Sequence, residues 1–160
     1  MVPSYKGLKP ASEASSRVKR NNRSSDTLHE VLLRRELWRG GLRFRKNVAS
    51  LPGKPDIVFS GAKVLVFCDG DFWHGRKWQT LEGKLDAGTN GKYWSAKIAA
   101  NIERDRRNTL LLEDAGWQVV RLWETDIKKD VAAAAAIVRD VIETRRQSGK
   151  LKQKHDLGAR

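Results

Sequence analysis

Residues 51–75 read LPGKPDIVFSGAKVLVFCDGDFWHG and contain the pattern that decides the fold. Two runs rich in β-branched and aromatic residues, 57–59 and 63–68, are separated by Ser-Gly-Ala, which predicts a hairpin of antiparallel strands. Three acids and a histidine lie at or beyond the strand ends: Asp56, Asp69, Asp71 and His74. Because the hairpin brings the start of one strand beside the end of the next, we expect these polar side chains to lie close together.

Outward from this hairpin, the apolar periodicity predicts helices at about 26–39, 93–115 and 131–144 and strands at 42–48 and 117–123. Ser25 or Asp26 is expected to cap the first helix, and the Gly- and Asn-rich stretch 83–92 is expected to be a loop. The strand at 63–68, the helix at 93–115 and the strand at 117–123 form a plausible βαβ unit with a parallel strand pair. The sequence therefore predicts an α/β fold with a mixed central sheet flanked by helices.

Composition sets the class of partner. The 160 residues carry a net charge of +13, which favours binding of polyanions such as nucleic acids, although a basic ribosome-associated protein would share it. No stretch is apolar enough for a membrane span or a secretory signal, and the single cysteine, Cys68, excludes an internal disulfide. A cytoplasmic, monomeric protein without a structural zinc site is expected.

The basic charge is concentrated at the two ends of the chain. Residues 1–25 contain six Lys and Arg, Arg20 and Arg23 among them, against one acid, and are expected to form a flexible arm that orders on its partner. Residues 26–146 form the expected domain. Residues 147–160 are expected to be a basic tail, with disorder beginning near Arg145.

The acids at the strand ends suit metal-dependent hydrolysis. Asp56 follows the rigid Pro-Gly-Lys-Pro approach and can hold a hard cation such as Mg²⁺, with a backbone carbonyl at Cys68 as a second oxygen ligand. Two such ions could polarise a phosphate while a neutral His74 takes the proton from an attacking water. Alternatively, Asp69 and Asp71 belong to a polar turn and His74 to the protein surface.

The adjacent aromatics Phe72 and Trp73 fit neither a helical nor a strand period. Large apolar side chains in such a loop can enter between base steps or stack on exposed bases, and Trp94, which follows the 83–92 loop, could join them. Packing in the core is the alternative.

Two helical segments add candidate residues. Glu30 becomes functional only if its helix packs it toward the acids. In the segment 101–107, Arg104 and Arg107 could reach DNA phosphates, and Asp105 could orient His74 or pair with an arginine. A salt-bridged surface face is the alternative for this segment.

Five ordered blocks between residues 17 and 126 resemble the very short patch repair (Vsr) DNA mismatch endonucleases, which have the restriction-endonuclease-like, PD-(D/E)XK-type fold. The blocks are SRVKRNNRSSDTLHE, LPGKPDIVF, VFCDGDFWHG, YWSAKIAANIERDRRN and GWQVVRLWE. The resemblance implies that Asp56 and the Cys68 carbonyl bind catalytic magnesium, that His74 is the hydrolytic base and that Glu30 supports water. It also implies that Phe72, Trp73 and Trp94 form the wedge that intercalates beside a T·G mismatch.

The chain departs from the family pattern in two respects. Where zinc-containing members carry Cys and His ligands, this chain has Asp71, Gly75-Arg76-Lys77-Trp78 and Thr125, so no structural zinc is expected. Asp69 replaces a His that this position can hold. Related Vsr-like homing endonucleases use a Glu, Asp, His, Asp signature, which Glu30, Asp56, His74 and Asp105 could satisfy.

The sequence thus predicts an Mg²⁺-dependent endonuclease, with two ions, that nicks double-stranded DNA at a T·G mismatch. Asp56, His74, Glu30 and Asp69 are its predicted catalytic residues. Two alternatives stay open: a homing or phage-type site-specific endonuclease, and a binder of distorted DNA that does not cleave.

Overall fold

The computed structural model describes residues 25–88 and 90–158, with side chains described as far as residue 150. Four strands form one sheet in the order β1-β2-β3-β4. Their bounds are β1 Arg45–Lys46, β2 Ile57–Phe59, β3 Val64–Asp69 and β4 Gln118–Trp123. The pairs β1–β2 and β2–β3 are antiparallel, and β3–β4 is parallel, which confirms the predicted hairpin and βαβ unit. The strand expected over 42–48 is reduced to the two residues of β1.

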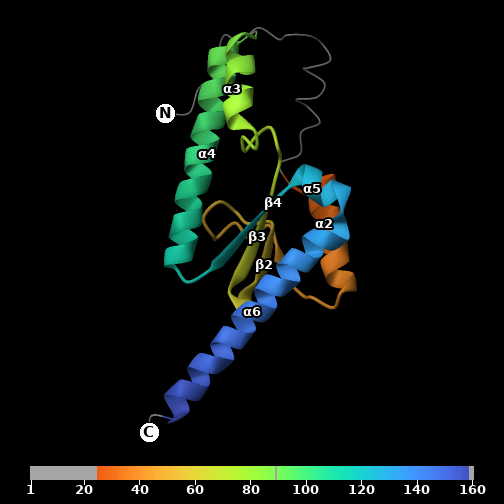
Figure 1. The fold of residues 1–160 in the computed structure, drawn as a ribbon, viewed down its shortest axis with the longest axis vertical. Coiled ribbons are helices and arrows are strands. Elements are labelled where there is room, and N and C mark those ends of the chain that lie inside the picture. The colour runs from red at the N-terminus through yellow and green to blue at the C-terminus, as the bar shows by residue number, and fades with distance from the viewer. Residues whose placement is uncertain (1–24, 89, 159–160) are drawn as a thin grey trace.

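Helices cover both faces of the sheet (Figure 1). Their bounds are α2 Leu28–Arg39, α3 Trp78–Asp86, α4 Gly91–Asp114, α5 Glu124–Lys129 and α6 Val131–Gly158. Alternation along β3 assigns its side chains to two cores. Val64, Val66 and Cys68 pack with α2, α5 and α6, whereas Leu65 and Phe67 pack with Leu112 of α4. All six residues of β3 are buried, as expected for a strand covered on both faces.

Some expectations about the helices were wrong. Thr27, not Ser25 or Asp26, is the N-cap residue of α2. Part of the predicted 83–92 loop belongs to α3, because Gly83 is accommodated inside a helix that packs on α4. Helix α6 continues through the expected disordered tail to Gly158, in keeping with the Arg, Gln and Lys residues there, which favour helix. The basic arm lies outside the described residues apart from Ser25.

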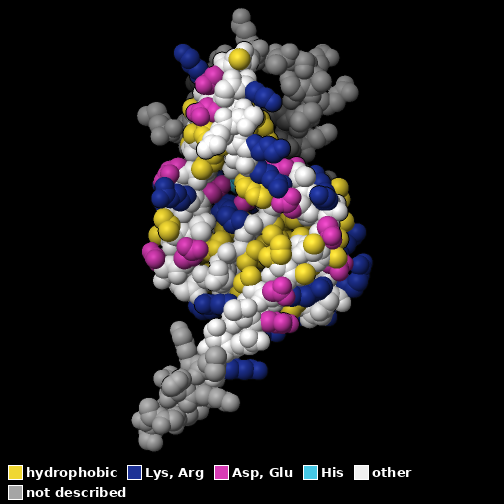
Figure 2. Space-filling model, viewed as in Figure 1, with side chains coloured by type: hydrophobic (Ala, Val, Ile, Leu, Met, Phe, Trp, Pro, Cys, Tyr) yellow, Lys and Arg dark blue, Asp and Glu magenta, His cyan; other side chains and the backbone are white. Residues whose placement is uncertain are grey.

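Two further observations concern the edge of the sheet and the hydropathy of the helices. β4 forms one edge of the sheet, and Figure 2 shows hydrophobic side chains on this side of the molecule, between α4 and α6. Within the described part of the chain, no helix combines the length and apolar character of a membrane span.

The segment between β3 and α3 lies against α4 through a close contact at Gly75. Its φ is +66°, and a Cβ atom added there would lie 2.5 Å from Ile102 Cδ1 and 3.3 Å from Ile98 Cγ2. Only glycine can adopt this left-handed backbone conformation without strain and also has no Cβ atom to clash with α4. Gly75 therefore determines how closely the segment 70–77 approaches α4.

We expect Gly75→Ala to lower the free energy of unfolding by about 1–3 kcal/mol, because it adds a clash to a left-handed backbone conformation. Urea denaturation measures the change. Gly61→Ala is the matched control, since its Cβ would meet no atom within 4 Å. Equal stability of the two variants would contradict the close contact.

Candidate active site

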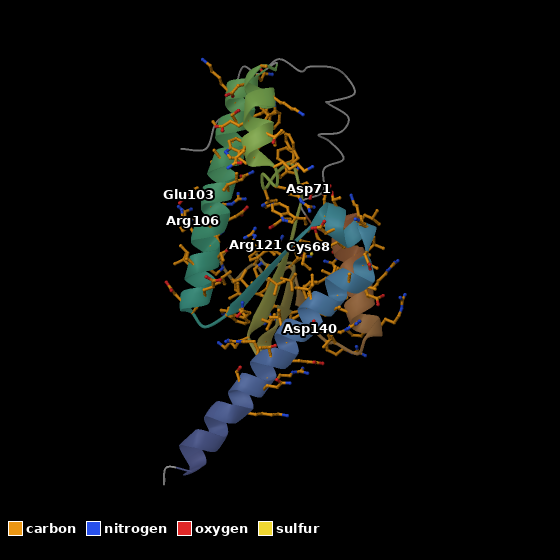
Figure 3. The ribbon with its side chains drawn as sticks, in the orientation of Figure 1. Cys68, Asp71, Glu103, Arg106, Arg121 and Asp140 are labelled. Atoms are coloured by element: carbon orange, nitrogen blue, oxygen red, sulfur yellow. The ribbon has the colours of Figure 1, made fainter. Side chains whose placement is uncertain are left out.

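A cavity of about 630 Å³ opens where β3 ends. It brings together residues from α2, the β2–β3 hairpin, the segment after β3 and α4. Among its lining residues are the five predicted to serve in catalysis or metal binding, namely Glu30, Asp56, Cys68, Asp69 and His74, together with Trp73. Figure 3 shows Cys68 and Arg121 at this end of the sheet, on strands that pair in parallel. Residues far apart in the sequence are therefore neighbours in one cavity.

Asp56 is held by the backbone of the neighbouring strand. Its Oδ2 atom accepts a hydrogen bond from the Cys68 N–H at 2.7 Å. The pKa of Asp56 is raised to about 7, mainly by burial and also by the Glu30 and Asp69 carboxylates, against the opposing effects of the Cys68 N–H and of Arg34. A carboxylate with such a pKa lies where an added positive charge is favourable.

His74 forms a pair with Asp105 of α4. The His74 Nδ1 atom is hydrogen-bonded to Asp105 Oδ2, so in the neutral imidazole the proton lies on Nδ1 and Nε2 is the acceptor. Burial alone would raise the pKa of Asp105, but the hydrogen bond and charge of His74, with Arg121 and Arg104, lower it below its usual value. Asp105 therefore stays ionised and orients the imidazole.

Arg121 is a member of the site that sequence reasoning missed. Its Nε and Nη2 atoms donate to the two oxygens of Asp69 at 2.6 and 2.8 Å, and Nη2 lies 3.5 Å from Asp105 Oδ2. Its guanidinium also reaches Thr109 of α4. Both Asp69 oxygens thus have a partner on β4, and the role predicted for Asp69 in tuning metal and water stays a prediction.

The first turn of α2 supplies Glu30 and His29. Glu30 accepts hydrogen bonds from the Asp26 N–H at 2.9 Å and from the Thr27 hydroxyl at 2.7 Å, which hold its buried side chain at the cavity. His29, which sequence reasoning missed, is buried, and its Nε2 lies 3.3 Å from the Cys68 carbonyl oxygen. The helix thus packs its glutamate toward the acids.

The donor set fits Mg²⁺ held by few protein atoms. Within the described residues, no three His, Cys, Asp or Glu side chains come together as a metal-binding group. Mg²⁺ commonly uses one or two carboxylates and keeps several waters. Asp56 with the Cys68 carbonyl meets this need, because the carbonyl has a second lone pair besides the one that His29 can use.

The three predicted wedge aromatics form a cluster beside the cavity. The ring centroid of Phe72 lies 5.1 Å from that of Trp73 and 6.3 Å from that of Trp94, and Trp73 and Trp94 are 5.9 Å apart. Tyr93, which sequence reasoning did not single out, packs on Trp94. Phe72 is 40% exposed, whereas Trp73 lines the cavity next to His74. The cluster is therefore positioned at the surface and not in either core.

Asp71 belongs to a polar contact between the aromatic segment and α5. It is hydrogen-bonded to the Thr125 hydroxyl, and its Oδ1 lies 3.6 Å from Arg76 Nη1. Arg76 in turn donates to Asp126 at 2.8 Å. Asp71 and Thr125, which stand at positions where zinc-containing members have ligands, are thus direct partners here.

The cations predicted to bind DNA fall into two groups. Arg104 and Arg107 lie exposed on α4, with Arg104 Nη2 3.5 Å from Asp105 Oδ1. Arg20 and Arg23 lie outside the described residues. In Figure 3, Glu103 and Arg106 lie on the outer side of α4.

Comparison with known proteins shows extensive similarity to DNA-nicking enzymes. The family model described as DNA mismatch endonuclease Vsr matches residues 10–80. The type II nicking enzyme V.NmeDIP of Neisseria meningitidis serogroup C is 38% identical over 138 residues, covering 86% of this chain and 92% of that protein. V.NaeI of Lentzea aerocolonigenes, also a type II nicking enzyme, is 41% identical, covering 78% of this chain and 76% of its own length. The Escherichia coli DNA mismatch endonuclease Vsr is 39% identical over 64% of each chain.

The raised pKa of Asp56 predicts how the metal-free protein responds to pH. The unfolded chain releases this proton near pH 3.8 and the folded protein near pH 7, so the contribution of Asp56 to stability is lost as pH rises through that window. The loss is about 1.4 kcal/mol for each pH unit between the two values.

We therefore expect the free energy of unfolding to fall less for Asp56→Asn than for the wild type as the pH rises from about 4 to about 8. Urea unfolding with a chelator present measures this. Above neutral pH, Mg²⁺ should raise the stability of the wild type more than that of the variant. Parallel pH profiles for the two proteins would contradict the assignment.

Proposed function

The chain belongs to the Vsr family and is a DNA endonuclease, and from this premise we propose that it nicks duplex DNA at a T·G mismatch and uses Mg²⁺. The family has the restriction-endonuclease-like fold, which confirms the predicted fold class. One observation carries the proposal: the Asp56 carboxylate and the His74–Asp105 pair lie in or beside one cavity at the end of β3.

Each group in the cavity has a chemical task in this proposal. Asp56 and the Cys68 carbonyl would hold Mg²⁺, which supplies charge to polarise the scissile phosphate and to stabilise the leaving oxygen. His74 Nε2 takes a proton as the water oxygen attacks phosphorus and the bond to the leaving sugar oxygen breaks. Asp105 keeps the imidazole in the required tautomer, and Glu30 orients water.

Specificity for the mismatch rests on the aromatic cluster. Phe72 is exposed, while Trp73 adjoins His74, so the same segment carries both the reacting base and the aromatic rings. Insertion of such rings between base steps requires unstacking, which is easiest at a mismatched pair. The names of the relatives, a DNA mismatch endonuclease and several nicking enzymes, support this reading.

We expect His74→Ala to slow nicking by roughly 10²–10⁴-fold, because a general base contributes about that much. Asp105→Asn should slow nicking as well. Single-turnover cleavage of a strand-labelled T·G duplex, with and without Mg²⁺, measures both rates. Affinity for the duplex measured in the presence of a chelator is the control and should not fall. Cleavage at the wild-type rate by His74→Ala would refute the role of the base.

The double variant Phe72→Ala/Trp73→Ala should lose the preference for a T·G duplex over the matched duplex, because the rings that enter the base stack are gone. The measurement is the ratio of cleavage rates on the two duplexes, each labelled on one strand. An unchanged ratio would assign both aromatics to packing. If the wild type cuts the matched duplex equally well, the chain is a site-specific endonuclease and mismatch specificity is refuted.

A further inference from the structure

A second cavity, of about 470 Å³, adjoins the first. The two share four lining residues, Gly53, Lys54, Phe67 and His74. The charged groups differ between them. The charged residues that line the first are four acids and two lysines, whereas the second contains Lys54, Arg104 and Arg121 with one acid, Asp105.

The ion pairs already described decide which of these groups are available to a ligand. Arg121 is engaged by both oxygens of Asp69, and Asp105 is hydrogen-bonded to His74. Lys54 and the Asn108 amide have no hydrogen-bond or ion-pair partner among the described side chains, and the Arg104 side chain is 51% exposed. Two cations and one amide donor thus face a cavity next to the general base.

The backbone at Lys54 fixes the point from which its side chain extends. Its φ is +53°, a left-handed conformation that lysine adopts at a cost of about 1–2 kcal/mol and that glycine adopts without one. The turn is held by a hydrogen bond from the Lys54 N–H to the Leu51 carbonyl at 3.0 Å. The side chain of Lys54 reaches both cavities from a fixed turn one residue before Pro55.

Gly53 permits the close approach of the opposite wall. A Cβ atom there would lie 3.0 Å from Asn108 Nδ2 and 3.2 Å from the Phe67 ring, and its φ is +75°. The LPGKPD turn is thereby brought directly against α4, and Lys54 and Asn108 become walls of one cavity.

We propose that this second cavity is a subsite for a DNA backbone phosphate adjacent to the scissile one, bound by Lys54, Arg104 and Asn108. The proposal rests on the proposed function, since it requires DNA in the first cavity. Consecutive phosphates of one strand then meet unlike surroundings. The phosphate that reacts lies beside carboxylates, which require a bound metal cation between them and the phosphate. The adjacent phosphate contacts the positively charged side chains of the protein directly. By binding this phosphate, the subsite determines which phosphate of the DNA strand lies next to His74.

The chain offers a closely matched control in Lys63. It is also an exposed lysine with a left-handed backbone, φ +54°, but it lies at the start of β3, whereas the cavities lie at its end. Across six residues the two ends of the strand are about 20 Å apart. Both lysines are therefore comparable in charge and backbone strain. They differ in position and in one contact, since Lys63 Nζ lies 4.9 Å from the centroid of the Trp117 ring.

The experiment compares Lys54→Gly with Lys63→Gly in binding to a T·G duplex, with a chelator present, at several salt concentrations. Lys54→Gly should bind several-fold more weakly at low salt, and its log–log salt slope should be smaller by about 1, the loss of one phosphate contact. Lys63→Gly should change neither quantity. Urea unfolding should show Lys54→Gly as stable as the wild type or more so, because it removes a strained residue. Lys63→Gly relieves the same strain and loses the contact with the Trp117 ring, so the urea curve shows whether it is folded under the binding conditions.

Lys54→Gln and Lys63→Gln repeat the comparison with side-chain length retained, so that a loop loosened by glycine cannot mimic the result. Equal affinity and equal salt slopes for the Lys54 and Lys63 variants would overturn the subsite while the wild type still binds and nicks DNA. A wild type that binds no duplex would instead overturn the proposed function itself.

Discussion

The hydrogen bond from the Cys68 N–H to Asp56 Oδ2 joins the start of one strand to the end of the next, and the other groups of the site are arranged around it. It depends on the antiparallel register in which Ile57 faces Val66. A shift of one residue would turn Asp56 to the other face of the sheet. The two apolar cores that bury both faces of β3 oppose such a shift, so the packing of the hairpin also specifies the position of the Asp56 carboxylate.

The charges around this bond are divided into two sets. Asp69 and Asp105 share Arg121, and Asp105 also holds His74, so these acids are compensated within the protein. Asp56 is removed from solvent and lies near the Glu30 and Asp69 carboxylates, and both effects raise its pKa. The protein thus orients the His74 imidazole through its own side chains and leaves one acid, Asp56, whose ionisation an added cation would favour. The neighbouring cavity, lined by Lys54 and Arg104, continues this division with the opposite sign of charge.

The segment after β3 is fixed at two places. Gly75 allows close packing on Ile98 and Ile102 of α4, and the Asp71–Thr125 hydrogen bond attaches the segment to α5. Between these attachments lie Phe72, Trp73 and His74. A short segment anchored on two helices can hold an imidazole and an aromatic cluster at a fixed distance from each other. The proposed function requires this, because the rings are to enter the DNA base stack beside the phosphate that is cut.

The sequence by itself determined the hairpin, the βαβ unit and the neighbourhood of Asp56, Cys68 and His74, because strand alternation, helical periodicity and Gly-Pro turns are local signals. The approach of Glu30 to this neighbourhood, the Asp105–His74 pair and the positions of His29 and Arg121 were decided only by tertiary structure. Arg121 and Asp69 are 52 residues apart, and no local pattern distinguishes an arginine that neutralises two acids from one on a solvated strand. The short helix α5 follows from its packing on α2 and α6, and the extension of α6 from helix propensity, in stretches without a strong apolar period. A sequence records which groups can react, whereas their distances and charge compensation arise when separate elements pack together.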